Sequence, residues 1–184
     1  MNKKILVCYL FTKFDKTKQL TDFINNYKKY SSGLNHELLI CFKLIEKEKV
    51  FYLCEYLKDI KYVEFIDISK DNDFDFGSYK RVSEHYLNYD ILFLNSHSYP
   101  NCNDWLIKLA KHKNDNNIIG TSGSFESMTD SIKLKKFYKF FSYFFKKLRF
   151  KRNFPSYPNP HLRTSSFFIN GKSFNEFIKY KKIN

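Results

Sequence analysis

Short apolar runs alternate with longer amphipathic segments along this chain, beginning at its first residues. "KKILVCYLF" is an apolar run of strand length behind two lysines. The residues from Asp15 to Tyr30 then place Leu20, Phe23 and Ile24 at helical spacing. A strand followed by a helix is the unit from which α/β sheets are built, so this pattern limits the fold class from the start.

The same alternation continues along the rest of the chain. Strands are expected at "HELLICFK", "KYVEFIDI", "YDILFLN", "NNIIGTSG" and "SSFFIN", and helices around residues 50–57, 77–87, 105–109, 130–149 and 174–180. Since helical crossovers join parallel strands, the sequence predicts an α/β fold with a mostly parallel central sheet and helices on both faces. Its 184 residues suit a single domain over 1–184.

A polar tip follows the fourth of these strands. The apolar run from Ile91 to Leu94 stops at Asn95, Ser96, His97 and Ser98. In open α/β sheets, ligands bind beyond the carboxyl ends of the strands. We therefore expect this tip, the acidic loop at residues 71–77 and the loop after the first strand to form one crevice.

Charge and cysteine content restrict the partners and the compartment. The formal net charge is +13, and such a positive field favours phosphates, anionic lipid or nucleic acid. The four cysteines are scattered, with no C-x-x-C pair, which predicts reduced thiols in a cytoplasmic protein. No apolar run reaches the roughly 18 residues that a membrane span requires.

Residues 72–112, "NDFDFGSYKRVSEHYLNYDILFLNSHSYPNCNDWLIKLAKH", resemble the nucleotide-sugar core of GT-A-fold glycosyltransferases of the family-2-like group. The shared order is an acidic loop, a Gly opening a helix with a basic residue, an apolar strand ending in polar residues, and a helix opening with Trp-Leu. "GTSGSFES" and "PNPHLRTSSFFI" also resemble a bacterial subgroup of these enzymes. The likeness runs from Lys3 to Ile178.

This resemblance implies a glycosyltransferase with a Rossmann-like GT-A domain. It would transfer a sugar from a nucleotide-diphospho-sugar to a polysaccharide or lipid-linked acceptor in cell-surface glycan synthesis. We expect it in the cytoplasm, peripheral to the inner face of the cell membrane. Chains of this family continue further, so an end at Asn184 makes a shortened member with a short acceptor segment the expectation.

The resemblance also implies the donor-binding residues. In the family, two carboxylates of a D-x-D motif bind a divalent metal, and Asn95 and His97 occupy those positions here. Either Mn²⁺ or Mg²⁺ is held weakly by these two residues, or no metal is used and basic side chains stabilise the leaving diphosphate. The full donor-binding set is predicted to be Asp73, Asp75, Gly77, Arg81, Asn95, Ser96, His97, His161 and Arg163.

Several of these residues have a simpler structural interpretation. The aspartates at 73 and 75 could cap the next helix, Arg81 could lie on the surface, and His97 could bind a loop carbonyl. Glu126 is the candidate general base for an acceptor hydroxyl, and the alternative is a capping role with Ser122 or Ser124. Arg163 offers a fork to phosphate oxygens.

The segment from Lys133 to Arg152 holds nine basic residues, eight aromatics and no acidic residue. On the helix expected at about 130–150, one apolar stripe would lie between lysines; it consists of Phe137, Phe140, Phe141, Phe144, Phe145 and Leu148. The stripe could pack on the domain, or it could dock on an anionic membrane. Nucleic acid is the less expected partner, since no recognition motif accompanies the lysines. A non-catalytic basic binding module is therefore the alternative function.

Overall fold

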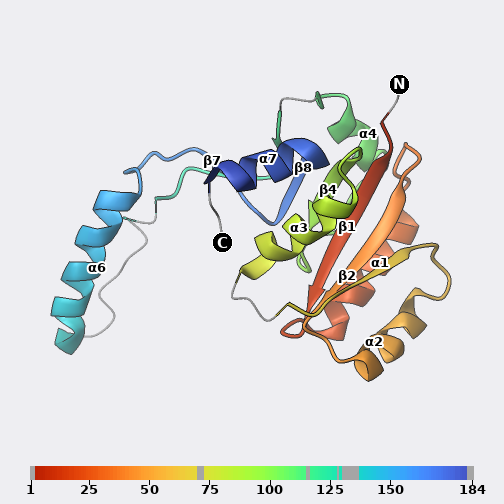
Figure 1. Cartoon of the computed structure of the whole chain (residues 1–184), viewed down its shortest axis with the longest axis horizontal. Helices are drawn as coiled ribbons and strands as arrows, with labels where there is room; N and C mark the ends of the chain where they lie inside the picture. The colour runs from red at the N-terminus through yellow and green to blue at the C-terminus, as the bar shows by residue number, and fades with distance from the viewer. Residues whose placement is uncertain (1–2, 70–72, 115–116, 128, 130–136, 182–184) are drawn as a thin grey trace. The chain divides into compact units, whose positions relative to one another are not determined.

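The computed structural model describes residues 3–69, 73–114, 117–127, 129 and 137–181. The chain divides into two compact units, which are treated separately below. The first consists of residues 1–121 and 164–184, and the second of residues 122–163 (Figure 1). A single domain over 1–184 remains a prediction.

A six-stranded sheet forms the centre of the first unit, in the order β3-β2-β1-β4-β8-β5. Its neighbours from β3 to β4 pair in parallel, whereas β8 is antiparallel to both β4 and β5. The predicted α/β fold with a mostly parallel sheet is confirmed. The strand bounds are β1 Ile5–Thr12, β2 Glu37–Lys43, β3 Val63–Asp67, β4 Asp90–Leu94, β5 Ile119–Gly120 and β8 Ser166–Asn170.

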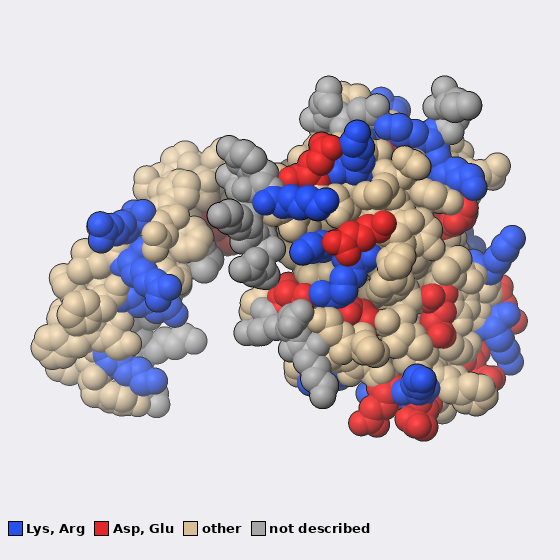
Figure 2. All heavy atoms as spheres, viewed as in Figure 1, with Lys and Arg blue, Asp and Glu red and all other residues tan. Residues whose placement is uncertain are grey.

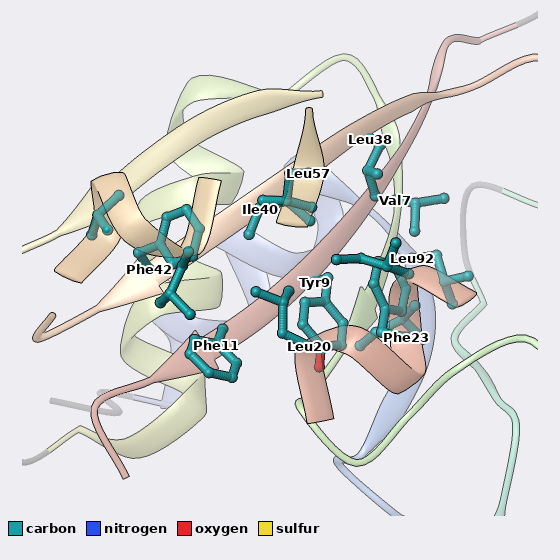
Figure 3. Close-up of a cluster of buried hydrophobic side chains, with 14 of the residues drawn as sticks. Val7, Tyr9, Phe11, Leu20, Phe23, Leu38, Ile40, Phe42, Leu57 and Leu92 are labelled. Atoms are coloured by element: carbon teal, nitrogen blue, oxygen red, sulfur yellow. The ribbon is translucent and has the colours of Figure 1, made fainter. Parts of the chain in front are cut away.

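Helices cover both faces of this sheet, because alternate strand residues point to opposite faces. Val7, Tyr9 and Phe11 of β1 pack with α1, α2 and α4, and Figure 3 shows this cluster. Leu6 and Cys8 point the other way and pack with α3 and α7. The helix bounds are α1 Thr17–Lys29, α2 Lys47–Cys54, η1 Glu55–Leu57, α3 Phe74–His85, α4 Trp105–Ala110 and α7 Gly171–Lys181.

Several boundaries differ from the sequence prediction, among them one of α3 and one of the fifth strand. Helix α3 begins at Phe74 and not at Gly77, so the glycine lies inside the first turn. The fifth strand is only two residues long, because its pairing with β8 is confined to Ile119 and Gly120. Both differences reflect tertiary contacts that a local pattern does not contain.

The second unit contains a two-stranded ribbon and one long helix. Strand β6 (Gly123–Ser124) pairs antiparallel with β7 (His161–Leu162). The short helix η2 (Phe137–Lys139) leads into α6 (Phe140–Asn153). The basic aromatic helix predicted at about 130–150 thus corresponds to α6, while its residues 130–136 lie outside the described part. Among the described residues, no helix is long and apolar enough to cross a membrane.

Candidate active site at the carboxyl edge of the sheet

Four parallel strands end at the same edge of the sheet, and each end brings polar side chains to it. Strands β1, β2 and β3 end at Thr12, Lys43 and Asp67, and β4 ends just before Asn95. In the parallel pairing of these strands, Thr12 lies beside Lys43, and Lys43 lies beside Asp67. The polar ends of separate sequence segments therefore form one row, as predicted for a ligand crevice.

An ionic cluster occupies the β2–β3 side of this edge. The Arg81 guanidinium donates to both oxygens of Asp67, from Nε at 2.9 Å and from Nη2 at 2.7 Å. Its Nη1 donates to Asp73 Oδ2 at 2.6 Å, and Lys43 Nζ donates to Asp73 Oδ1 at 2.5 Å. Ser78 Oγ adds a third donor to Asp67 at 2.6 Å. Two carboxylates and two cations thus satisfy one another.

The charge balance of this cluster determines how its groups titrate. Burial alone would raise the pKa of Asp67, but hydrogen bonds from Arg81 and Ser78 outweigh it, and the pKa lies below its ordinary value. The pKa of Asp73 is lowered in the same way, with Arg81 and Lys43 outweighing the effect of burial. These carboxylates are therefore ionised whenever the protein is folded near neutral pH.

Gly77 leaves the space that the Asp73 carboxylate fills. A Cβ built at Gly77 would lie 1.7 Å from Asp73 Oδ2 and 1.8 Å from its Cγ. No side chain can be accommodated there unless Asp73 moves. The glycine is therefore required by the ionic cluster, independently of any ligand.

Asp75 behaves differently from the two paired aspartates. It is half-buried and makes no hydrogen bond or ion pair with any described residue. Burial, and then the charge of Asp15, raise its pKa, and Lys43 and His97 only partly oppose them. A half-buried carboxylate that bonds no described residue is the kind of group that a ligand's hydroxyl or amino hydrogens can bond.

The polar tip of β4 is held by hydrogen bonds to the first loop and to helix α1. Ser96 Oγ donates to Asp15 Oδ1 at 2.6 Å, and Asp15 Oδ2 accepts from the Thr12 backbone N–H at 2.7 Å. Gln19 Nε2 lies 3.2 Å from both ring nitrogens of His97. Residues far apart in sequence therefore fix the position of the tip.

The metal-binding alternative does not fit this tip. Asn95 Oδ1 already accepts hydrogen bonds from the His97 backbone N–H and from Ser98 Oγ, both at 3.1 Å. The His97 ring faces the Gln19 amide. Within the described residues, no group of three or more His, Cys, Asp or Glu side chains is arranged to hold a metal ion. Because the Asn95 side-chain oxygen already accepts hydrogen bonds within its own turn, it is a poor ligand for a cation.

Three of the predicted residues belong to the second unit. Arg163 Nη2 lies 3.6 Å from Glu126 Oε2, and both side chains are exposed. His161 Nδ1 lies 2.7 Å from the Asn159 carbonyl oxygen. The β6–β7 ribbon brings these residues together, because it pairs Ser124 with His161. The capping alternative for Glu126 has partial support, since its backbone N–H donates to Ser124 Oγ at 3.1 Å.

Sequence reasoning missed four residues at this edge: Asp15, Gln19, Lys43 and Asp67. Two of them carried a usable signal, because "LLICFK" and "EFID" each end an apolar run with a charge. Asp15 and Gln19 gave no comparable signal. Their role depends on the contact between the first loop and the β4 tip.

Comparison with solved structures identifies the architecture. The mannosyltransferase Ktr4p from S. cerevisiae, solved with GDP, matches with TM-score 0.53 and 12% identity over 98% of this chain and 62% of its own. The WbbM bifunctional glycosyltransferase matches with TM-score 0.54 and 11% identity over 100% of this chain and 34% of its own. The chain has the GT-A nucleotide-diphospho-sugar transferase fold.

A GT-A-like sheet is also found in 4-diphosphocytidyl-2C-methyl-D-erythritol synthase from Anaerococcus prevotii. It matches with TM-score 0.51 and 11% identity over 99% of this chain and 78% of its own. At such identities the likeness is one of fold. No protein-family model and no curated protein matches the sequence. The chain spans less than two thirds of the length of Ktr4p and WbbM.

Proposed function

We propose that this chain is an enzyme that transfers a sugar from a nucleotide-diphospho-sugar to a glycan or lipid-linked acceptor in cell-surface polysaccharide synthesis. The observation that carries the proposal is Asp75, a half-buried carboxylate without a described partner at the carboxyl edge of a GT-A sheet. A nucleotide's ribose and base carry hydrogen-bond donors that this carboxylate would accept. Ktr4p, which has the same fold, has been solved with GDP, and this supports nucleotide binding.

The remaining donor-binding residues divide into two groups under this proposal. Asp73, Gly77 and Arg81 form the first group, since they contact one another and Arg81 pairs with Asp67 at the end of β3. Asn95, Ser96 and His97 lie just after β4, where Asp15 holds Ser96 and Gln19 holds His97. The paired groups fix the backbone around Asp75, so that the carboxylate is presented at low cost in conformational entropy.

Arg163 and His161 would neutralise the leaving diphosphate in place of a metal. Arg binds phosphate oxygens through two parallel hydrogen bonds, and such charge-assisted bonds are stronger than neutral ones. Glu126, paired with Arg163, would accept the proton of the attacking acceptor hydroxyl. The ion pair keeps the anion-binding group and the proton acceptor side by side.

A thermal-unfolding screen with UDP and GDP tests the donor proposal. Either nucleotide at a hundredfold excess over its Kd should stabilise the fold by about 2.7 kcal/mol. The stabilisation should survive EDTA, change little with Mg²⁺ or Mn²⁺, and fall in Arg163→Ala. Arg152→Ala, which removes an exposed cation from α6, is the matched control. The absence of a shift with any nucleotide would sink the proposal, and strict metal dependence with an unaffected Arg163→Ala would overturn its metal-free part.

Docking of α6 on the inner leaflet of the cell membrane is the second part of the proposal. None of the described residues from Phe140 to Asn153 is buried. Lysine and arginine side chains lie along this helix, which is at the left of Figure 2. Each cation gains roughly 1 kcal/mol beside an anionic leaflet. A membrane-bound enzyme would meet a lipid-linked acceptor in two dimensions.

A non-catalytic module for nucleic acid is the alternative, motivated by the net charge of +13. Its affinity for an oligonucleotide would fall steeply with salt, because bound counterions are released from each neutralised phosphate. Filter binding over a salt series separates the two functions. Tight, salt-sensitive oligonucleotide binding without a nucleotide-diphosphate effect would favour the module.

A further inference from the structure

Phe74, the first residue of α3, has a backbone conformation that an aromatic residue rarely adopts. Its φ is 51°, in the left-handed region, where the Cβ is crowded by the backbone. Packing of the phenyl ring does not explain this conformation, because the residue is 74% exposed. A costly backbone conformation of this kind persists only where the surrounding structure enforces it. Another group must therefore hold the backbone of Phe74 in place.

The ammonium group of Lys43, the last residue of β2, binds the chain at this point. Lys43 Nζ donates to Asp73 Oδ1 at 2.5 Å and also to the carbonyl oxygen of Phe74. Lys43 is buried, with 5% of the residue exposed, so its side chain has few other conformations available. The lysine thus connects the end of β2 to the two residues at which α3 begins.

The bond to the Phe74 carbonyl does more than complete an ion pair. Asp73 is also paired with Arg81 Nη1, at 2.6 Å, and its charge does not require Lys43 to reach the next residue. The Phe74 carbonyl and the Asp75 nitrogen belong to one planar peptide group. The orientation of that plane sets the direction in which the Asp75 side chain leaves the backbone. Lys43 therefore acts on Asp75 through the backbone.

We infer that Lys43 is a positioning residue for the donor site, which holds Phe74 in the left-handed conformation and thereby fixes the direction of the Asp75 carboxylate. This inference rests on the proposed function, in which Asp75 binds the nucleotide. Lys43 acts through the backbone of residue 74 and not by its charge on the ligand. A residue that adopts a positive φ freely at position 74 would therefore need Lys43 less.

Thermal unfolding over a titration with UDP and with GDP gives the Kd that tests this role. Lys43→Met keeps the aliphatic stem and removes the ammonium group. The Kd of the nucleotide that stabilises the wild type should rise about tenfold in this variant, which corresponds to about 1.4 kcal/mol. Phe74→Gly should keep the Kd within about threefold of the wild type, because glycine adopts a positive φ at little cost. Adding Phe74→Gly to Lys43→Met should restore most of the lost affinity.

Lys113→Met is the matched control, because Lys113 is an equally buried lysine at the opposite edge of the sheet. Its side chain is 4% exposed, against 6% for Lys43, and its Nζ lies 3.4 Å from Oδ1 of Asp90, the first residue of β4. Lys113→Met should lower the melting temperature and leave the nucleotide Kd unchanged. An equal rise of the Kd in both variants would mean that lost stability explains the effect, and the inference would be wrong.

Two further variants test the backbone of residue 74 with Lys43 in place, and they decide the question if Lys43→Met does not fold. Phe74→Val and Phe74→Asn both remove the ring, but asparagine tolerates the left-handed region and β-branched valine does not. Phe74→Val should raise the Kd about tenfold, whereas Phe74→Asn should change it little. Equal Kd values in these two variants would overturn the inference.

The wild-type titration separates the failure of this inference from that of the proposed function. A wild-type protein that responds to neither UDP nor GDP overturns the proposed function, and the inference falls with it. A wild-type response that Lys43→Met leaves unchanged overturns the inference alone. So does a double variant that binds as weakly as Lys43→Met, because Lys43 would then act on the nucleotide by its charge.

Discussion

At the scale of single residues, aspartates of one short segment titrate in opposite directions. Asp67 and Asp73 have pKa values below the ordinary carboxyl value, so the folded state binds fewer protons than the unfolded state. Their stabilising effect is complete above pH about 4 and is lost as the pH falls through the folded pKa. Unfolding by denaturant at a series of pH values should show this loss. In Asp67→Asn the free energy of unfolding should be about 3 kcal/mol lower at pH 7 and depend less on pH.

Asp75 should respond in the opposite way. Its pKa is raised, first by burial and then by Asp15, so the ionised form costs stability at neutral pH. Asp75→Asn removes that cost, and we expect the melting temperature at pH 7 to stay the same or rise. Stabilisation by UDP or GDP should weaken in the same variant. A clear fall in melting temperature would mean that the carboxylate is structural.

Gly77 gives a prediction whose sign is diagnostic. Replacing a helical glycine by alanine normally stabilises by about 1 kcal/mol. Here the new Cβ would lie 1.7 Å from Asp73 Oδ2 and would displace the carboxylate from Lys43 and Arg81. Gly77→Ala should therefore lose about 2 kcal/mol of unfolding free energy. Gly123→Ala, whose Cβ would lie 3.6 Å from the His161 carbonyl oxygen, should change stability little.

At the scale of elements, α6 combines an apolar stripe with an uninterrupted basic character. Phe141 and Phe145 are 75% and 67% exposed, so Phe141→Ser with Phe145→Ser should change the free energy of unfolding by less than about 1 kcal/mol. Each inserted Phe is worth about 1.5–3 kcal/mol, and co-sedimentation with anionic vesicles should fall at least tenfold. Neutral vesicles, and high salt that screens exposed charges, are the controls. An unfolded double variant would show that the stripe is core.

At the scale of the whole molecule, both hydrophobic clusters lie in the first unit. The chain leaves that unit after Thr121 and returns at Thr164, and the Thr121 N–H bonds the Ser166 carbonyl at 3.3 Å. A short Gly-Ser linker can therefore replace residues 122–163. We expect the shortened protein to unfold cooperatively, within a few degrees of the full chain, and to keep the Trp105 emission. Loss of the cooperative transition would show that the second unit is required for folding.

The sequence alone determined the class of the fold and the edge of the sheet at which its polar strand ends lie. Short apolar runs of strand length, each followed by apolar residues at helical spacing, permit few arrangements other than a layered α/β sheet, because both sheet faces must be covered. The polar stop at Asn95 to Ser98 placed polar side chains at the carboxyl edge of the sheet, where ligand binding stays a prediction. These are local patterns of the sequence. The folded structure keeps them because their apolar residues must be buried.

Tertiary structure decided which polar residues satisfy one another and which do not. The motif predicted equal roles for Asp73 and Asp75, yet only Asp73 meets Arg81 and Lys43, and Asp75 meets neither. The antiparallel insertion of β8 beside β4 also decided that Ser166 would be buried, with a hydroxyl that bonds none of the described residues. Hydrogen-bond partners depend on ångström distances between segments remote in sequence. No local pattern records those distances.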